Sequence, residues 1–202
     1  MWSRSRKKNR QAGFTGTELL VAIGIIAILT AIAIPGFSNW LPNYYLKAAT
    51  RDLYSNLQLA RLIAAKQNAA CAVIFDSGAT PGRYFLCSDP GANGSWDGPS
   101  AMGGDDVAEK AVMLSEYRGG IDFGGGSATD DIPGSGAPPA DPITYATPDD
   151  VALFSSTGMV VNFAVSGSYV YLCNSQGSSY GVGTPGVAGA VVMRRWHAGR
   201  WE

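Results

Sequence analysis

Residues 13–23 read GFTGTELLVAI, and the chain from Phe14 stays apolar as far as Ile34, with Glu18 as the only charged side chain. A helix rises about 1.5 Å per residue, so these 21 residues would extend for about 31 Å. That length matches the hydrocarbon core of a bilayer, which is about 30 Å thick. The stretch therefore predicts an N-terminal helix that spans a membrane.

The residues before this stretch are basic. Residues 1–13 contain five of the 15 basic residues and no acidic one, which favours retention of this end on the cytoplasmic side. A basic segment followed by an apolar run is also typical of a secretory signal peptide. However, no small-x-small cleavage site follows the run, and Gly13 stands at the junction instead. We therefore expect cleavage between Gly13 and Phe14, ahead of the apolar helix.

Glu18 is unusual inside such a helix. A charged side chain at the centre of a membrane helix costs on the order of 2.5–3.5 kcal/mol on insertion scales, and such residues usually have a partner. One explanation is that Glu18 lies close enough to the interface to reach water. The explanation we favour is a positive partner created by cleavage, namely the new α-amino group of Phe14 on a neighbouring subunit.

These residues resemble the class III signal of type IV pilins and type II secretion pseudopilins. That signal has a glycine before the cut, usually phenylalanine after it, and glutamate at the fifth mature position. The resemblance implies that a prepilin peptidase cleaves after Gly13 and methylates the new N-terminus at Phe14, and that Glu18 guides subunit assembly. Gly16 and Thr17 depart slightly from the residues often found there. The likeness covers about the first forty residues.

A second helical pattern follows the apolar run. Prolines interrupt the sequence at Pro35 and Pro42, and a proline inside a helix bends or locally melts it. After Pro42, six apolar residues recur at spacings of three and four, which indicates an amphipathic helix from about Asn43 to Ala70. These residues are Leu46, Ala49, Leu53, Leu57, Ala60 and Ala64. We expect this stripe to lie against a globular domain.

The rest of the chain reads as short strands and loops. The predicted strands are Cys71–Phe75, Arg83–Cys87, Val151–Phe154, Met159–Val165, Ser168–Cys173 and Gly189–Arg194. The turns after Phe154 and Val165 favour a meander of hairpins. We expect a flexible Gly-rich insertion at about 89–148, in which only Val107–Tyr117 has enough apolar residues to order, and a loop at Asn174–Gly186.

The predicted fold class is α+β, with a long N-terminal helix packed on a C-terminal antiparallel β-sheet domain. The expected parts are a cleaved leader at 1–13, a membrane and assembly half-helix at 14–42, and a periplasmic domain at 43–202 with helix 43–70 and strands from about 71. The order of elements, with Phe154-x-x-x-Gly158 and a terminal basic strand near Gly199-Arg200, is similar to the GspH/FimT group of minor pseudopilins. That second resemblance is looser and does not account for the insertion.

The cysteines and acids offer little for catalysis or metal binding. Cys71, Cys87 and Cys173 are widely spaced, so a Cys87–Cys173 disulfide and three buried free thiols both stay open. The only histidine is His197, and Gly-x-Ser-x-Gly is absent. The paired acids Asp105-Asp106, Asp130-Asp131 and Asp149-Asp150 lack a calcium-loop pattern and read as solvated loop residues. We expect no cofactor and no metal, and a substrate of an enzyme rather than an enzyme.

A basic and aromatic cluster ends the chain. Arg194, Arg195 and Arg200 alternate with Trp196 and Trp201, and arginines can neutralise phosphates while indoles stack on bases. Some members of the FimT side of the family bind DNA through such a C-terminal region. Without the leader, however, ten basic residues face sixteen acidic ones, a formal charge of −6, so DNA binding is the alternative and not the leading prediction.

The leading prediction is a structural minor pilin or pseudopilin of a type II secretion pseudopilus or a type IV pilus. Its expected partners are a prepilin peptidase, sister pilins and the bacterial inner membrane, which it would cross once before entering the filament. The alternatives are a pilus-associated DNA-binding subunit acting in DNA uptake, and a plain single-span protein with an extracytoplasmic ligand.

Overall fold

The computed structural model describes residues 13–146 and 150–202, apart from the side chains of Pro35 and Asn39. Its first element is one helix, α1 (Gly16–Gln67), which continues through both Pro35 and Pro42. The chain divides into two compact units, Met1–Asn39 and Trp40–Glu202. The predicted long N-terminal helix with two halves is therefore confirmed as one 52-residue helix, and its end lies three residues before the predicted one.

A left-handed residue ends α1. Asn68 has a φ of 51°, and the N–H of Ala69 donates to the carbonyl of Ala64 at 3.2 Å. This six-to-one hydrogen bond is typical of the Schellman motif, in which Gly or Asn takes the left-handed position. The chain can then turn directly into the first strand.

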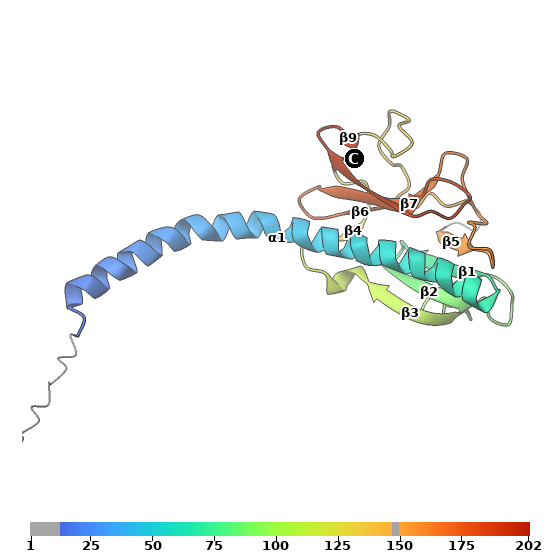
Figure 1. Cartoon of the computed structure of the whole chain (residues 1–202), viewed down its shortest axis with the longest axis horizontal. Helices are drawn as coiled ribbons and strands as arrows, with labels where there is room; N and C mark the ends of the chain where they lie inside the picture. Colours follow the sequence, from blue (N-terminus) through green and yellow to red (C-terminus); the bar gives the residue numbers. More distant parts are fainter. Residues whose placement is uncertain (1–12, 147–149) are drawn as a thin grey trace, which may run out of the picture. The chain divides into compact units, whose positions relative to one another are not determined.

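The second unit contains two antiparallel sheets (Figure 1). The first has the strand order β3-β2-β1-β5, and its strands are β1 (Cys71–Asp76), β2 (Arg83–Asp89), β3 (Val107–Met113) and β5 (Val151–Phe154). The second has the order β4-β6-β7-β8-β9, and its strands are β4 (Asp122–Phe123), β6 (Ser168–Cys173), β7 (Ser179–Thr184), β8 (Val192–His197) and β9 (Arg200–Trp201). A short 3-10 turn, η1 (Leu114–Glu116), follows β3. The α+β class is confirmed.

The C-terminal part of α1 supplies the centre of the core. All six residues of the predicted stripe, from Leu46 to Ala64, are at most 1% exposed, so this prediction is confirmed. They form one apolar cluster with residues of both sheets, among them Phe75 of β1, Phe154 of β5 and Leu172 of β6. Figure 1 shows this part of α1 running along both sheets. At roughly 25 cal/mol per Å² of buried apolar surface, such a shared core stabilises helix and sheets together.

Four strand predictions are confirmed and one is wrong. β1, β2, β5 and β6 begin at the predicted residues, but Met159–Val165 forms only an isolated bridge between Val160 and Phe154. Asn162 is the reason: its Oδ1 accepts from the N–H of Leu153 at 3.0 Å, and its Nδ2 donates to the carbonyl of Ala146 at 3.0 Å. A buried side chain here takes the hydrogen bonds that a neighbouring strand would otherwise make.

Three other expectations about the sheets need correction. The expected loop at Asn174–Gly186 contains β7, which is buried along its whole length. The final strand begins at Val192, runs to His197, and pairs with the additional strand β9. The expected hairpin meander does not connect β5 to β6, because β5 pairs with β1 and β6 pairs with β7 in the other sheet.

The Gly-rich region at 89–148 contains β3, η1 and β4 and contributes to the core. Ile121, Ile143 and Tyr145 are each at most 4% exposed. The N–H of Tyr171 in β6 donates to the carbonyl of Pro142 at 2.8 Å. Apolar side chains thus fasten this region to the second sheet, and its flexibility stays a prediction.

Candidate functional site

The predicted processing site lies just before α1. Gly13, Phe14 and Thr15 precede the helix without regular structure, while residues 1–12 of the expected leader lie outside the described residues. Phe14 is 88% exposed. A peptidase that cuts between Gly13 and Phe14 would therefore meet a chain without regular structure, with the Phe14 side chain exposed.

Thr15 and Glu18 cap the helix reciprocally. The Oε2 of Glu18 accepts from the N–H and from the hydroxyl of Thr15, both at 3.0 Å. In return, the N–H of Glu18 donates to Oγ1 of Thr15 at 3.3 Å. This is a capping box, in which two N–H groups that the first turn leaves without helical partners are both satisfied. The carboxylate also faces the positive end of the helix dipole.

The role of Thr15 was not predicted from the sequence. The signal was present, because Thr15-x-x-Glu18 before an apolar run is the usual pattern of a capping box. Glu18 therefore has a local structural role that does not require a second subunit. Because cleavage would leave Thr15 in place, this role does not compete with a later ion pair.

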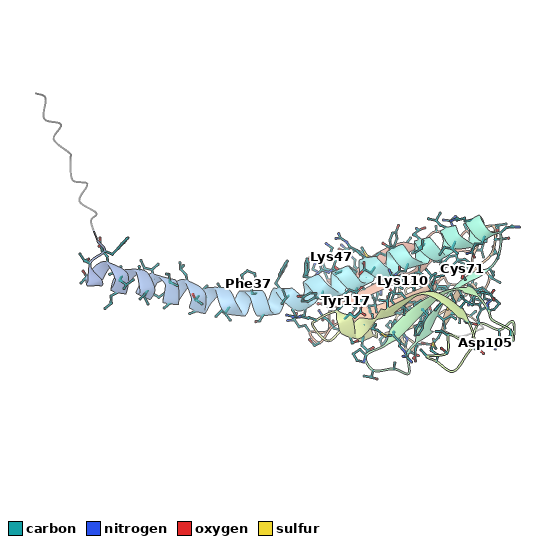
Figure 2. All side chains as sticks on the ribbon, turned by 90° about the horizontal axis from the view of Figure 1, so that it is seen from below. Phe37, Lys47, Cys71, Asp105, Lys110 and Tyr117 are labelled. Carbon is teal, nitrogen blue, oxygen red and sulfur yellow. The ribbon has the colours of Figure 1, made fainter. Side chains whose placement is uncertain are left out.

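The first unit exposes an apolar surface along its own part of α1, before Trp40. In Figure 2, side chains stand out all round the helix before Phe37. The helix contains an 18-residue window with a mean hydropathy of 2.6, of which no part is buried, so by length and composition it is able to cross a membrane. Phe14, Glu18, Val21 and Ile25 line one shallow groove on this surface. Such a surface needs lipid or other helices to cover it and indicates membrane anchoring.

The three C-terminal arginines do not form one site. β8 and β9 form a hairpin with Trp196 opposite Trp201, and their rings meet edge to face with centroids 5.4 Å apart. Nε1 of Trp201 donates to the carbonyl of Asp130 at 2.8 Å, so this ring serves packing. Arg200 forms an ion pair with Glu202, in which Nε of Arg200 lies 3.0 Å from Oε1 of Glu202.

Arg194 and Arg195 are neighbours on β8, so their side chains leave opposite faces of the strand. Arg195 lines an open cavity of about 430 Å³ together with Lys47 and Arg51 of α1. The other lining residues are Trp40, Asn43, Tyr44 and Tyr180. Among the described residues, the ion pairs are Arg83–Asp76 and Arg200–Glu202, so none of these three cations is in an ion pair there, although Glu202 lies opposite Arg195 across the β8–β9 pair. The basic partners of Arg195 thus come from the helix, which sequence order did not reveal.

The three cysteines are free thiols, and the Cys87–Cys173 bridge is not formed. Cys87 is fully buried in the first sheet, in a small cluster with Phe85 and Val151, whereas Cys173 lies in β6 of the second sheet. Burial raises the pKa of Cys71 to about 12 and that of Cys87 to about 12. It also raises the pKa of Cys173. All three are protonated at neutral pH and behave as small apolar residues.

The acidic pairs differ from one another. Asp105 and Asp106 lie close to Asp97, a residue that the sequence analysis did not connect with them. Burial is the main cause that raises the pKa of Asp106, with further contributions from Asp97 and Asp105.

Asp130, Asp131 and Asp150 each accept a hydrogen bond from a loop residue. Oδ1 of Asp130 accepts from the N–H of Gly136, and Oδ1 of Asp131 accepts from that of Ser135, both at 2.7 Å. Oδ2 of Asp150 accepts from the hydroxyl of Ser77, whereas Asp149 lies outside the described residues.

Comparison with known proteins agrees with the N-terminal pattern. The family described as the prokaryotic N-terminal methylation motif matches residues 8–34. Prepilin peptidase-dependent protein D of Escherichia coli is 53% identical over 45 residues, which are 22% of this chain and 28% of that protein. Pilin-like protein PilA1 of Thermus thermophilus is 38% identical over 87 residues, which are 42% of this chain and 53% of that protein. No solved structure matches the chain.

The chain spans between about a quarter and about half of the length of these relatives. The matches do not confirm the narrower GspH/FimT group. The matches and the fold, one long N-terminal helix followed by antiparallel sheets, nevertheless agree on a broader resemblance to pilin-like proteins. The chain is similar to type IV pilin-like proteins and carries the prokaryotic N-terminal methylation motif at residues 8–34.

Proposed function

We propose that this chain is a minor pilin or pseudopilin, cut by a prepilin peptidase between Gly13 and Phe14 and assembled through the first part of α1 into a type II secretion pseudopilus or a type IV pilus. The observation that carries the proposal is the uncovered apolar helix of the first unit, with Glu18 as its single charge. In this proposal residues 1–13 are the leader, 14–42 the membrane and assembly segment, and 43–202 a periplasmic domain.

The groove beside Glu18 supports the assembly step. Phe14 and Glu18 line the same groove, and cleavage gives Phe14 a positive α-amino group. In an apolar surrounding, such a charge on one subunit and the carboxylate of Glu18 on the next attract each other far more strongly than in water. The protein then acts as the substrate of the peptidase and as a building block, without catalysis of its own.

Two variants separate the capping role of Glu18 from the charge. Glu18→Gln keeps an oxygen that can accept from Thr15 but removes the negative charge, whereas Thr15→Ala removes the hydroxyl of the cap and keeps the charge. We expect both to be cleaved, and only Glu18→Gln to be lost from purified filaments. Normal incorporation of Glu18→Gln would contradict the ion pair.

The N-terminus itself is tested by mass spectrometry of the purified protein. The expected product begins with methylated Phe14, and Gly13→Leu should keep the full leader because the larger side chain blocks the peptidase. A wild-type chain that retains Met1, in cells that contain the peptidase, would contradict the whole proposal and favour a plain single-span protein.

The chain layout supports a rare subunit of the GspH/FimT kind. A long helix, two sheets and a terminal basic hairpin are the features on which that finer assignment depends. The region between β2 and β5 adds a large, irregular surface next to the sheets. A subunit that repeats along a filament needs tightly matched contacts, which favours a minor rather than an abundant role.

DNA binding is the second candidate, and the cavity at Arg195 is the observation that favours it. This cavity places three cations, Lys47, Arg51 and Arg195, beside the aromatic rings of Trp40, Tyr44 and Tyr180. Proteins that bind single-stranded nucleic acids use this combination: cations contact the phosphates and aromatic rings stack on the bases. We expect the double variant Lys47→Ala with Arg195→Ala to lose binding of a labelled oligonucleotide.

The matched control is Arg194→Ala, which removes a charge from the same strand but not from this cavity. Fluorescence anisotropy at about 50 and 200 mM salt gives the readout, because phosphate contacts weaken steeply with salt. Binding absent at low salt, or lost equally in the control, would eliminate this candidate.

A further inference from the structure

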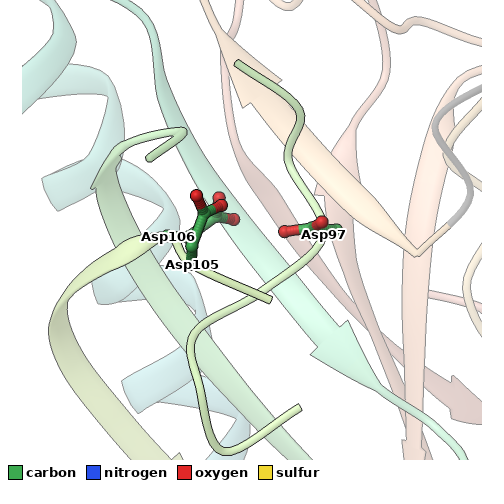
Figure 3. Close-up of side chains that lie close together, drawn as sticks. All are labelled: Asp97, Asp105 and Asp106. Atoms are coloured by element: carbon green, nitrogen blue, oxygen red, sulfur yellow. The ribbon is translucent and has the colours of Figure 1, made fainter. Parts of the chain in front are cut away.

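The loop between β2 and β3 brings three carboxylates together. Asp97, Asp105 and Asp106 each offer one oxygen, and these oxygens lie within 4.8 Å of one another. Figure 3 shows Asp105 and Asp106 side by side with Asp97 across from them. Asp97 and Asp105 are exposed, while Asp106 is 5% exposed.

Backbone contacts fix the positions of the carboxylates. Oδ2 of Asp106 accepts from the N–H of Gly98 at 2.9 Å, and the N–H of Asp106 donates to the carbonyl of Gly98 at 3.1 Å. Oδ2 of Asp105 accepts from the N–H of Ala92 at 2.8 Å. Oδ2 of Asp97 accepts from Nδ2 of Asn93 at 2.8 Å. Each acid thus uses one oxygen to hold the loop and keeps its other oxygen for a further partner.

The remaining oxygen of Asp106 has no partner. Oδ1 of Asp106 is buried and makes no hydrogen bond. The ion pairs among the described residues, Arg83–Asp76 and Arg200–Glu202, leave all three carboxylates without a cationic neighbour. A buried acceptor without a partner is costly, and more so when it is charged and faces two like charges. A cation at this point would supply the missing partner.

Two glycines allow the close approach. A side chain at Gly104 would collide with Oδ1 of Asp97, and one at Gly91, which has a φ of +68°, would lie 2.5 Å from Oδ1 of Asp105. At both positions the backbone lies so close to a carboxylate that no side chain would fit between them. The loop therefore packs directly against the acid cluster.

We propose that Asp97, Asp105 and Asp106 bind a calcium ion. Calcium takes six to eight oxygen ligands at about 2.3–2.6 Å, so two oxygens on opposite sides of one ion lie about 5 Å apart. Magnesium, with bonds of about 2.0–2.1 Å and a strict octahedron, fits a loop of this spacing less well. Exposure of Asp97 and Asp105 leaves room for water to complete the shell.

Calcium would fasten the loop to the sheet. Asp89 ends β2 and Val107 begins β3, so the ion would join the residues between them into one unit without changing either strand. The site lies in the second unit, and it does not depend on whether the N-terminus is cleaved.

The test is titration calorimetry of the full-length protein in detergent, freed of metal with a chelator, using calcium chloride as the probe. We expect one saturable site with a dissociation constant on the order of 10⁻⁵–10⁻³ M, and a higher melting temperature in calcium. Asp97→Asn should weaken binding at least about tenfold, because it removes one of three charges from an exposed position that does not threaten folding.

Asp130→Asn is the matched control, since Asp130 is an acid of another Gly-rich loop, and it should bind calcium as the wild type does. Absence of calcium-dependent heat and of any melting shift at about 10 mM calcium would overturn the proposal. Equal loss in Asp130→Asn, unchanged binding in Asp97→Asn, or equally tight binding of magnesium would overturn it as well.

Discussion

Leu57→Ala and Leu62→Ala form a matched pair that tests how α1 is joined to the sheets. Both residues lie on the same helix, but Leu57 is 0% exposed in the main apolar cluster and Leu62 is 65% exposed. The same three carbon atoms are removed in each case, so only burial differs between the variants.

The expected magnitudes follow from that difference. At Leu57 the lost transfer free energy is about 0.8 kcal/mol per buried carbon, or roughly 2.4 kcal/mol, and the cavity left behind brings the total to about 3–5 kcal/mol. At Leu62 about a third of this transfer term applies and no cavity forms, so the cost is under about 1 kcal/mol, part of which the better helix propensity of alanine offsets.

Thermal unfolding of the full-length protein in detergent, followed by tryptophan fluorescence, measures both variants. For a domain of this size, about 1 kcal/mol shifts the melting temperature by about 2–4 °C. We therefore expect Leu57→Ala to melt at least about 4 °C below Leu62→Ala. Equal melting temperatures would mean that α1 and the sheets do not share one core, and this would refute the account of the fold.

Three further predictions concern the second unit. The raised pKa of Cys71 and of Cys87, each about 12 against 9.0, means that the unfolded thiols ionise first, so the contribution of these thiols to stability should be constant below pH 9 and stability should fall as the pH rises from 9 towards 12, as followed by fluorescence. Asn68→Ala should lower the free energy of unfolding by about 1 kcal/mol, whereas Asn68→Gly should not, because only the alanine opposes a left-handed backbone; urea unfolding compares the two. Gly183→Ala should cost more than about 3 kcal/mol or prevent folding, since its Cβ would meet the backbone of the neighbouring strand, while Gly186→Ala, which has open space, should be neutral by circular dichroism.

Local patterns predicted the parts of the fold that are local. The six-residue stripe of α1 repeats with the helical period, so its burial could be read directly. β1 and β2 are joined by a short turn and pair with each other, as neighbouring strands usually do. The single long helix was predicted as well; only the local melting considered for Pro35 and Pro42 does not occur, because α1 stays helical through both.

Non-local pairing was beyond the sequence. β7 contains Gly181 and Gly183 and reads as a loop, yet Gly181 makes room for the side chain of Ile132, which packs over the strand from the region before β5. Nothing in the local pattern indicates that β5 and β6 belong to different sheets. That division depends on partners that are distant along the chain.

The candidate sites also differ in whether they depend on local sequence or on residues that are distant along the chain. Glu18 could be recognised from its own neighbourhood, and so could Thr15, because a capping box is a pattern of four residues. The cavity at Arg195 joins β8 to residues of α1 that are far earlier in the chain. The acid cluster needs a loop to bring Asp97 beside Asp105 and Asp106, which composition alone does not predict.

The two units also differ in what they can determine about assembly. The methylation motif ends at residue 34, so the segment that we propose to anchor and dock is the segment that matches a general family motif. A shared segment cannot select between two filaments, because specificity is a difference in affinity between competing partners. The acidic loop between β2 and β3, the region before β5 and the cavity at Arg195 lie outside the matched motif, in residues 40–202. If the apolar helix provides the affinity for the filament, these surfaces must provide the choice of filament.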